Sequence, residues 1–173
     1  PGSTHEAVFS DRAGIVKVYE AVTQYCGFSA IEAGKTMGLF PYGKPNKEIP
    51  ELFVHNGKGT LSNRNLIIPT YPNAALVNYD NYHALEEKLQ VDQKDLTELQ
   101  SRRDLAYACQ TDTQEEVRKL IYKAVEMTGK KKVVISGGYG LNCVANYYYL
   151  DTLRKDGIEI YVEPVSNDAG TAM

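Results

Sequence analysis

The sequence predicts an α/β fold, chiefly because one stretch in its last third has the pattern of a strand, a helix and a second strand. Val133–Ile135 is expected to form a short buried strand, Ser136–Gly140 a glycine turn, Leu141–Arg154 a helix, and Ile158–Val162 the second strand. A turn and crossover of these lengths are typical of parallel strands joined by a right-handed connection. Helical periodicity elsewhere in the chain supports the same class.

Two further helices are predicted from the spacing of apolar residues. Ser10 and Asp11 can cap the first, whose apolar positions between Ile15 and Cys26 recur every three or four residues, and Gly27 can end it. The second covers Ser101–Thr128, with a possible new segment beginning at Thr113. Its apolar face is expected to contain Leu105, Cys109, Val117, Leu120, Ile121 and Ala124.

The region between these helices is expected to be loops and one hairpin. Residues 34–45 contain three glycines and two prolines, which predicts a shaped loop. Leu52–His55 and Asn65–Ile68 flank a turn at Asn56–Gly59 and are predicted to pair as a β-hairpin. Pro69–Asp80 is expected to be a surface loop.

Composition places the chain among ordinary globular domains. It has 173 residues, 43% hydrophobic and 24% charged, which suits one domain and excludes a disordered chain. The formal charge of −3 gives no general attraction to nucleic acid. No apolar run approaches the roughly 20 residues that cross a bilayer, and no signal sequence is evident, so a cytoplasmic protein without membrane or nucleic-acid partners is expected.

Cysteine and histidine are too sparse for a self-contained metal or disulfide framework. Cys26, Cys109 and Cys143 are far apart in the sequence and are expected to be small core residues. The three histidines have no spacing that would place two imidazoles on one helical face.

The main candidate site is the glycine turn Ser136–Asn142, between the carboxyl end of a strand and the amino end of a helix. Glycines allow a phosphate to approach the backbone, and the free N–H groups of the helix favour an anion. The alternative is a tight turn that only needs positive φ at Gly137 or Gly138. A Rossmann fingerprint fails because Cys143 replaces its third glycine, although Glu163 imitates the ribose-binding acid.

Other nucleotide and hydrolase motifs do not fit this turn. No Gly-Lys-Ser/Thr follows it, and Val134 stands where a hydrolase elbow needs glycine, so Ser136 is not expected to be a nucleophile. Asp168 follows the second strand and can bind a divalent metal or a ribose hydroxyl, or cap a helix. Lys35 can meet a phosphate as a point charge, or simply be an exposed lysine.

Three ordered blocks resemble the amino-terminal, nucleotide-binding domain of the O-carbamoyltransferase family, which includes nodulation-factor and antibiotic carbamoyltransferases. The most specific block begins Ser-Gly-Gly-Tyr-Gly-Leu-Asn-Cys-Val-Ala-Asn at Ser136 and continues from Val162 to Ala172. Residues from about Glu51 to Thr128 match loosely. The blocks span Tyr19–Phe28, Gly34–Gly43, and Ser136–Asn146 together with Val162–Ala172.

The resemblance implies a ribonuclease-H-like lobe of the actin, hexokinase and heat-shock ATPase superfamily, with a mixed sheet flanked by helices. Members use ATP and carbamoyl phosphate to make a carbamoyl-adenylate, and transfer the carbamoyl group to a hydroxyl acceptor. By this resemblance a divalent metal, iron or magnesium, would be bound by Asp168. The nucleotide contacts would come from Lys35, Ser136, Gly137, Gly138, Asn142 and Gly170.

The same resemblance leads us to expect a fragment. Residues 1–173 would form a single lobe, with the first lobe and its His-rich metal motif before it and a carboxyl-terminal domain after it. The piece alone is therefore expected to be inactive. Two alternatives stay open: a small-molecule kinase lobe of the same superfamily, and a nucleotide-binding module without catalytic activity.

Overall fold

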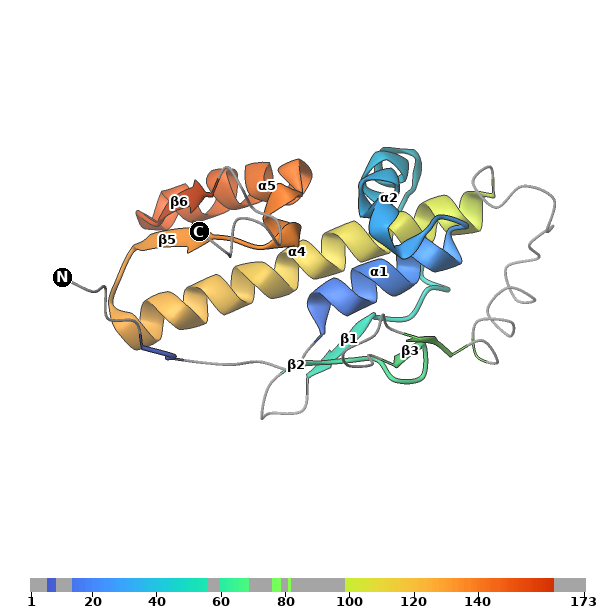
Figure 1. Ribbon diagram of the computed structural model, residues 1–173, viewed down its shortest axis with the longest axis horizontal. Helices are drawn as coiled ribbons and strands as arrows, with labels where there is room; N and C mark the ends of the chain where they lie inside the picture. The colour runs from blue at the N-terminus through green and yellow to red at the C-terminus, as the bar shows by residue number, and fades with distance from the viewer. Residues whose placement is uncertain are drawn as a thin grey trace. The chain divides into compact units, whose positions relative to one another are not determined.

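The computed structural model describes residues 6–8, 14–55, 60–68, 76–78, 81 and 99–163. The chain is a mixed α/β protein, which confirms the predicted class (Figure 1). It divides into two compact units, Ala13–Glu116 and a second unit that combines Val117–Met173 with Pro1–Arg12, and each is considered by itself. No helix among the described residues is both long and apolar enough to cross a membrane.

Helix α1, Ile15–Tyr25, packs the predicted apolar stripe into the core of the first unit. Val18 and Val22 are fully buried, in agreement with the periodicity. The helix starts after Gly14 in a left-handed conformation and ends before Gly27 at φ 93°. Gly27 therefore supplies the expected stop, whereas the predicted cap at residues 10–11 lies outside the described residues.

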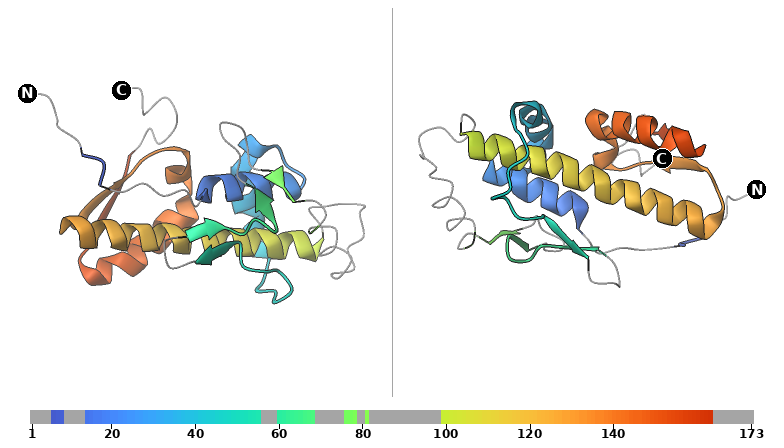
Figure 2. Two further views of the ribbon diagram at one scale, coloured as in Figure 1. Left: turned by 90° about the horizontal axis from the view of Figure 1, so that it is seen from below. Right: turned by 180° about the vertical axis from the view of Figure 1, so that it is seen from behind.

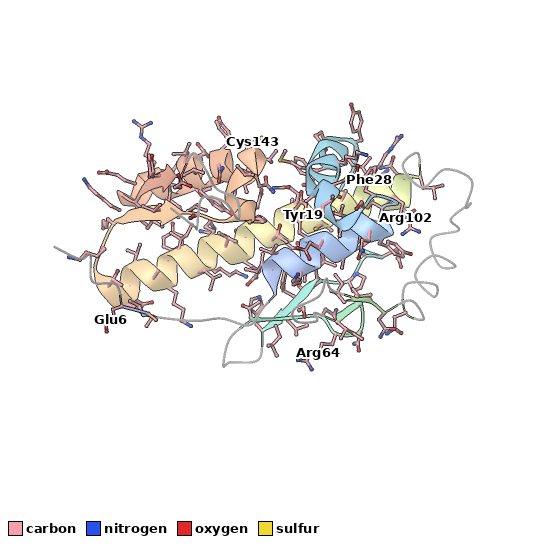
Figure 3. All side chains as sticks on the ribbon, viewed as in Figure 1. Glu6, Tyr19, Phe28, Arg64, Arg102 and Cys143 are labelled. Carbon is pink, nitrogen blue, oxygen red and sulfur yellow. The ribbon has the colours of Figure 1, made fainter. Side chains whose placement is uncertain are left out.

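Helix α4, Gln100–Thr128, confirms the longest predicted helix but has no second start. Thr113 is buried, and its hydroxyl donates to the carbonyl of Cys109 at 2.6 Å, so the residue sits within a continuous helix. Tyr19 donates to Gln110 Oε1 at 2.8 Å and joins α1 to α4 (Figure 3). Of the predicted apolar face, Leu105, Cys109 and Ile121 are buried, Val117 and Leu120 are half-buried, and Ala124 is exposed.

The loop predicted over residues 34–45 is wrong in its first half, because this stretch forms α2, Ala33–Leu39, followed by the 3-10 turn Phe40–Tyr42. The 3-10 turn η1, Ala30–Glu32, leads directly into α2 and starts with a capping box, in which Ser29 N donates to Glu32 Oε2 at 2.9 Å. Thr36 is buried and donates to Thr23 Oγ1 at 2.8 Å. Capping and tertiary contacts thus outweigh the low helix propensity of two glycines.

The predicted hairpin has the wrong second strand. Strand β1, Phe53–His55, pairs antiparallel with β2, Thr60–Ser62 (Figure 2). In this register His55 lies opposite Thr60. Ile67–Ile68 instead forms β3 and pairs with β4, Leu76–Val77, inside the stretch expected to be a loop. Thr60 also donates to Glu116 Oε2 at 2.9 Å, which anchors the β1–β2 hairpin on α4.

The second unit contains the predicted strand–helix–strand. Strand β5, Lys132–Ile135, pairs in parallel with β6, Glu159–Val162. They are connected through the 3-10 turn η3, Gly138–Leu141, helix α5, Cys143–Leu153, and a second 3-10 turn, Arg154–Asp156. The described strands of the whole chain form three separate two-stranded sheets.

The core of the second unit lies between α5, the β5–β6 pair and the last turns of α4 (Figure 1). Its buried members are Ile121, Ala145, Tyr149, Leu153 and Ile158. The strand predicted to be buried is covered on one face only: Val133 and Ile135 pack against the core, whereas Val134 is 62% exposed. Burial therefore alternates along β5, as in a strand with one covered face.

Candidate functional site

The candidate site is the turn that links β5 to α5 in the second unit. Ser136 follows β5 directly, Gly138 begins the 3-10 turn η3, and Asn142 precedes α5. The order strand, glycine turn and helix is as predicted. The turn therefore brings Ser136, Gly137, Gly138 and Asn142 together over seven residues of one unit.

Gly137 determines the shape of the turn. Its φ of 89° and ψ of 170° fall in a region that glycine adopts and residues with a Cβ rarely do. The sequence predicted a positive φ at Gly137 or Gly138, and only Gly137 of these two has one. A Cβ added at either glycine would meet no atom within 4 Å, so both positions are open to an approaching ligand.

Asn142 is the N-cap of α5. Its Oδ1 accepts from Ala145 N at 3.0 Å, and its side chain is buried, with 8% exposed. The cap fixes where the helix starts and hence which N–H groups point out of its amino end. The first turn of α5 contains no acidic side chain, so the positive end of its dipole has no carboxylate there.

Asn146, one turn into α5, makes a contact with the turn that the sequence did not lead us to expect. Its Nδ2 donates to the carbonyl of Gly140 at 2.7 Å, which ties the helix back to the turn. The signal was present in the sequence, since Asn142 and Asn146 are four residues apart and thus share a helical face. Its side chain is partly buried.

Glu163 lies at the same edge of the parallel pair as the turn. Its backbone N–H donates to the carbonyl of Ile135 at 3.1 Å, one residue before the turn begins. This hydrogen bond makes Glu163 a neighbour of Ser136 across the two strands. In the sequence, Glu163 stands out only because it imitates the ribose-binding acid of a Rossmann fold.

Lys35 belongs to the first unit, Ala13–Glu116, whereas the turn belongs to the second. Its ammonium pairs with Glu32 Oε1 at 2.5 Å and lies 5.6 Å from the centre of the Phe28 ring. The ammonium and a backbone bond from Ser29 lower the pKa of Glu32 below its ordinary value. Lys35 is thus a partnered lysine, and binding a phosphate would require it to leave Glu32.

Asp168 and Gly170 lie outside the described residues. Among the residues that are described, no group of three or more His, Cys, Asp or Glu side chains could hold a metal ion. One carboxylate is a poor divalent site by itself, because such ions take several oxygen or nitrogen ligands. The described donors therefore do not fit a metal centre.

The expectation that all three cysteines are core residues is wrong for Cys143. Cys26 and Cys109 are buried, but Cys143, the first residue of α5, is exposed (Figure 3). Burial raises the pKa of the Cys26 thiol to about 12, opposed in part by the charge of Arg102. Burial also raises the pKa of Cys109, which the nearby Cys26 and Asp112 raise further.

Comparison with known proteins assigns the chain to a family. The model of the carbamoyltransferase N-terminus matches residues 3–173. Nodulation protein NolNO of Sinorhizobium fredii is 28% identical over 96% of this chain and 23% of its own length. An uncharacterized protein of Synechocystis is 30% identical over 90% of this chain and 25% of its length.

A third relative, nodulation protein NolO of Bradyrhizobium diazoefficiens, is 26% identical over 95% of this chain and 28% of its own length. The chain thus spans about a quarter of the length of these curated relatives. The family model covers nearly all of the sequence, including the β5–α5 turn. This chain belongs to the family of carbamoyltransferase amino-terminal domains.

Proposed function

We propose that this chain is the nucleotide-binding part of an ATP-dependent O-carbamoyltransferase. The observation that carries the proposal is the open glycine turn at the amino end of α5, in a chain whose family is that of carbamoyltransferases. In the proposed reaction, ATP and carbamoyl phosphate give a carbamoyl-adenylate, and the carbamoyl group passes to a hydroxyl acceptor. The proposed fold is a ribonuclease-H-like lobe, for which the parallel β5–β6 pair is suitable.

In this proposal the turn binds phosphate through its backbone. Gly137 and Gly138 leave space above the chain, so an anion can approach the N–H groups of the turn without meeting a side chain. Asn142 fixes the start of α5, whose dipole favours a negative charge there. Ser136 is exposed at the same edge, where its hydroxyl can contact phosphate or ribose.

Further contacts to the nucleotide and to a metal are proposed for residues outside the turn, and phosphate binding by the turn does not depend on them. Lys35 would add a positive charge after release from Glu32, and Gly170 would add a backbone contact. Asp168 would be one ligand of a divalent ion, iron or magnesium. Because a single carboxylate binds such an ion weakly, the other ligands would have to come from elsewhere. We propose that the chain alone transfers no carbamoyl group.

Calorimetric titration with ADP and ATP tests the proposal, in magnesium and in chelator, with NAD as a control. Adenine nucleotides should bind and NAD should not. Gly138→Val should weaken binding tenfold or more, about 1.4 kcal/mol, because a branched side chain would occupy the space above the turn. Since a Cβ there meets no atom within 4 Å, the variant should melt close to the parent temperature.

Contrasting variants separate loss of binding from loss of folding. Gly137→Val forces a Cβ onto a φ of 89° and should lower the melting temperature whether or not a ligand binds there. Unchanged ADP affinity in Gly138→Val would remove the turn from the site. Nucleotide binding that does not respond to carbamoyl phosphate would favour the nucleotide-binding module over the transferase.

Asp168 is tested through the metal dependence of the same titration. Asp168→Asn should reduce the difference between magnesium and chelator if the carboxylate is a ligand. If the residue is instead a helix cap, the substitution should change thermal stability and leave the metal dependence intact.

A further inference from the structure

We propose that Asn146 is a positioning residue for the nucleotide, which holds the Gly140 carbonyl away from the phosphate-binding side of the turn. This inference rests on the proposed function of the same turn and deepens it. Asn146 lies within the residues that match the family. Its role follows from one contact, one unpaired atom and the requirements of an anion site.

The contact fixes the orientation of the Asn146 amide. Nδ2 lies 2.7 Å from the carbonyl oxygen of Gly140. Reversing the amide would place two acceptor oxygens at that distance, so the nitrogen must face Gly140. The backbone N–H of Asn146 meanwhile donates to the Asn142 carbonyl at 2.9 Å, which fixes its place in the first turns of α5.

The other end of the amide argues against a purely stabilising role. With Nδ2 committed to Gly140, Oδ1 is buried and has no hydrogen-bond partner among the described residues. A buried acceptor without a donor is unfavourable, and a leucine of the same shape would avoid it. The favourable part of the side chain is therefore its donation to the turn.

That donation fixes the direction of one carbonyl group of the turn, that of Gly140. Gly140 is buried in the middle of η3, and its N–H donates to the Gly137 carbonyl at 2.8 Å. Asn142 N donates to the Tyr139 carbonyl at 3.0 Å and completes the tight winding of the turn. A phosphate is attracted by N–H groups and repelled by carbonyl oxygens. Because Asn146 holds the Gly140 carbonyl towards α5, this oxygen does not face a phosphate on the open side of the turn.

The winding also leaves a donor at the start of the turn. Gly138 is the first residue of η3, and the N–H of a first helical residue has no acceptor within its own turn. The position above Gly138 is open as well. Asn146 thus acts at a distance from the ligand, through Gly140, on the geometry of the residues that would meet the phosphate.

The test compares Asn146→Leu with the control Tyr147→Leu, the next residue of α5, whose side chain is 74% exposed. Hydrogen exchange without nucleotide is measured at the amides of Gly140 and Asn142, together with melting temperature and the affinity for ADP. In Asn146→Leu we expect exchange at these two amides to be about tenfold faster and the dissociation constant for ADP to be about tenfold higher. The control should change neither quantity.

Each result distinguishes the positioning role from the proposed function. Unchanged exchange at Gly140 and Asn142 would overturn the positioning role, whatever ADP does. Faster exchange with unchanged ADP affinity would overturn it too, because the turn would then be held without serving binding. If the parent chain does not bind ADP, the proposed function fails and the nucleotide role of Asn146 fails with it, while the exchange data still report its hold on the turn.

A second variant covers the case in which Asn146→Leu does not fold. Asn146→Asp keeps the shape and polarity but cannot donate from a carboxylate, and a negative charge near the start of a helix is favourable. It should fold and show the same faster exchange at Gly140 and Asn142. Normal exchange in a folded Asn146→Asp would refute the inference, because the donation to Gly140 would then be dispensable.

Discussion

Thiol labelling gives a direct test of the structure around α5. Of the three cysteines, Cys26 and Cys109 are fully buried, whereas Cys143 is exposed at the first position of α5. The native chain should therefore react quickly at one thiol and the chain in denaturant at three. The substitution Cys143→Ser should abolish the fast reaction.

The size of the difference follows from burial and from the pKa of Cys26. Its pKa is raised from 9.0 to about 12, which lowers the thiolate fraction at pH 8 about a thousandfold. Because the thiolate is the reactive form, this factor multiplies the steric protection of a side chain with no exposed area. Burial raises the pKa of Cys109 in the same direction.

The assay is the release of a chromogenic thiolate from a disulfide reagent at pH 8, followed over time. One equivalent should react in the fast phase, and Cys143→Ser should show none. The control Cys109→Ala should retain one. Two or three fast equivalents in the native parent, or fast labelling of Cys143→Ser, would contradict the buried placement of the other two cysteines.

Four further outcomes follow. Saturating ADP should slow the labelling of Cys143 severalfold, measured in the same assay, because Cys143 adjoins the proposed phosphate turn. Gly43→Ala should lower the free energy of unfolding in urea by about 2 kcal/mol or more, since its Cβ would lie 2.0 Å from the Arg103 carbonyl oxygen. Gly38→Ala should instead raise it by about 0.5–1 kcal/mol, because this exposed helical position has no atom within 4 Å. Stability should fall as pH rises from 9 towards 12, since unfolding lets the buried Cys26 and Cys109 thiols ionise; the share of Cys26 is up to about 4 kcal/mol, and the Cys26→Ala profile should fall less by that amount.

The elements that the sequence predicted well are those whose signal is local. The β5–α5–β6 stretch has apolar strands, a glycine turn and a helix of ordinary length, so its neighbours in sequence are also its partners in space. The sequence also limited the positive φ of a tight turn to Gly137 or Gly138, and the structure has it at Gly137. The four residues of the turn that were proposed as a site are accordingly together.

The failures come from contacts that are distant in sequence. Helix α2 contains Gly34 and Gly38, which lower its propensity, but buried Thr36 bonds to Thr23 of α1 and holds it in place. Thr60–Ser62 is short and has polar residues at both ends, and its pairing with β1 is supported by Glu116 of α4, far along the chain. Neither stabilising partner is evident from a window of neighbouring residues.

The candidate turn is built from its own neighbourhood, and this determines what can be learned from the chain. Gly137 gives the turn its shape, Asn142 caps α5, and Asn146 holds Gly140, so these three contributions come from ten consecutive residues. Backbone N–H groups that are set by such local contacts are preorganised for an anion before it binds. The affinity for ADP that Gly138→Val and Asn146→Leu lose therefore measures the contribution of the turn, and any higher affinity of a longer member of the carbamoyltransferase family measures groups added to this chain.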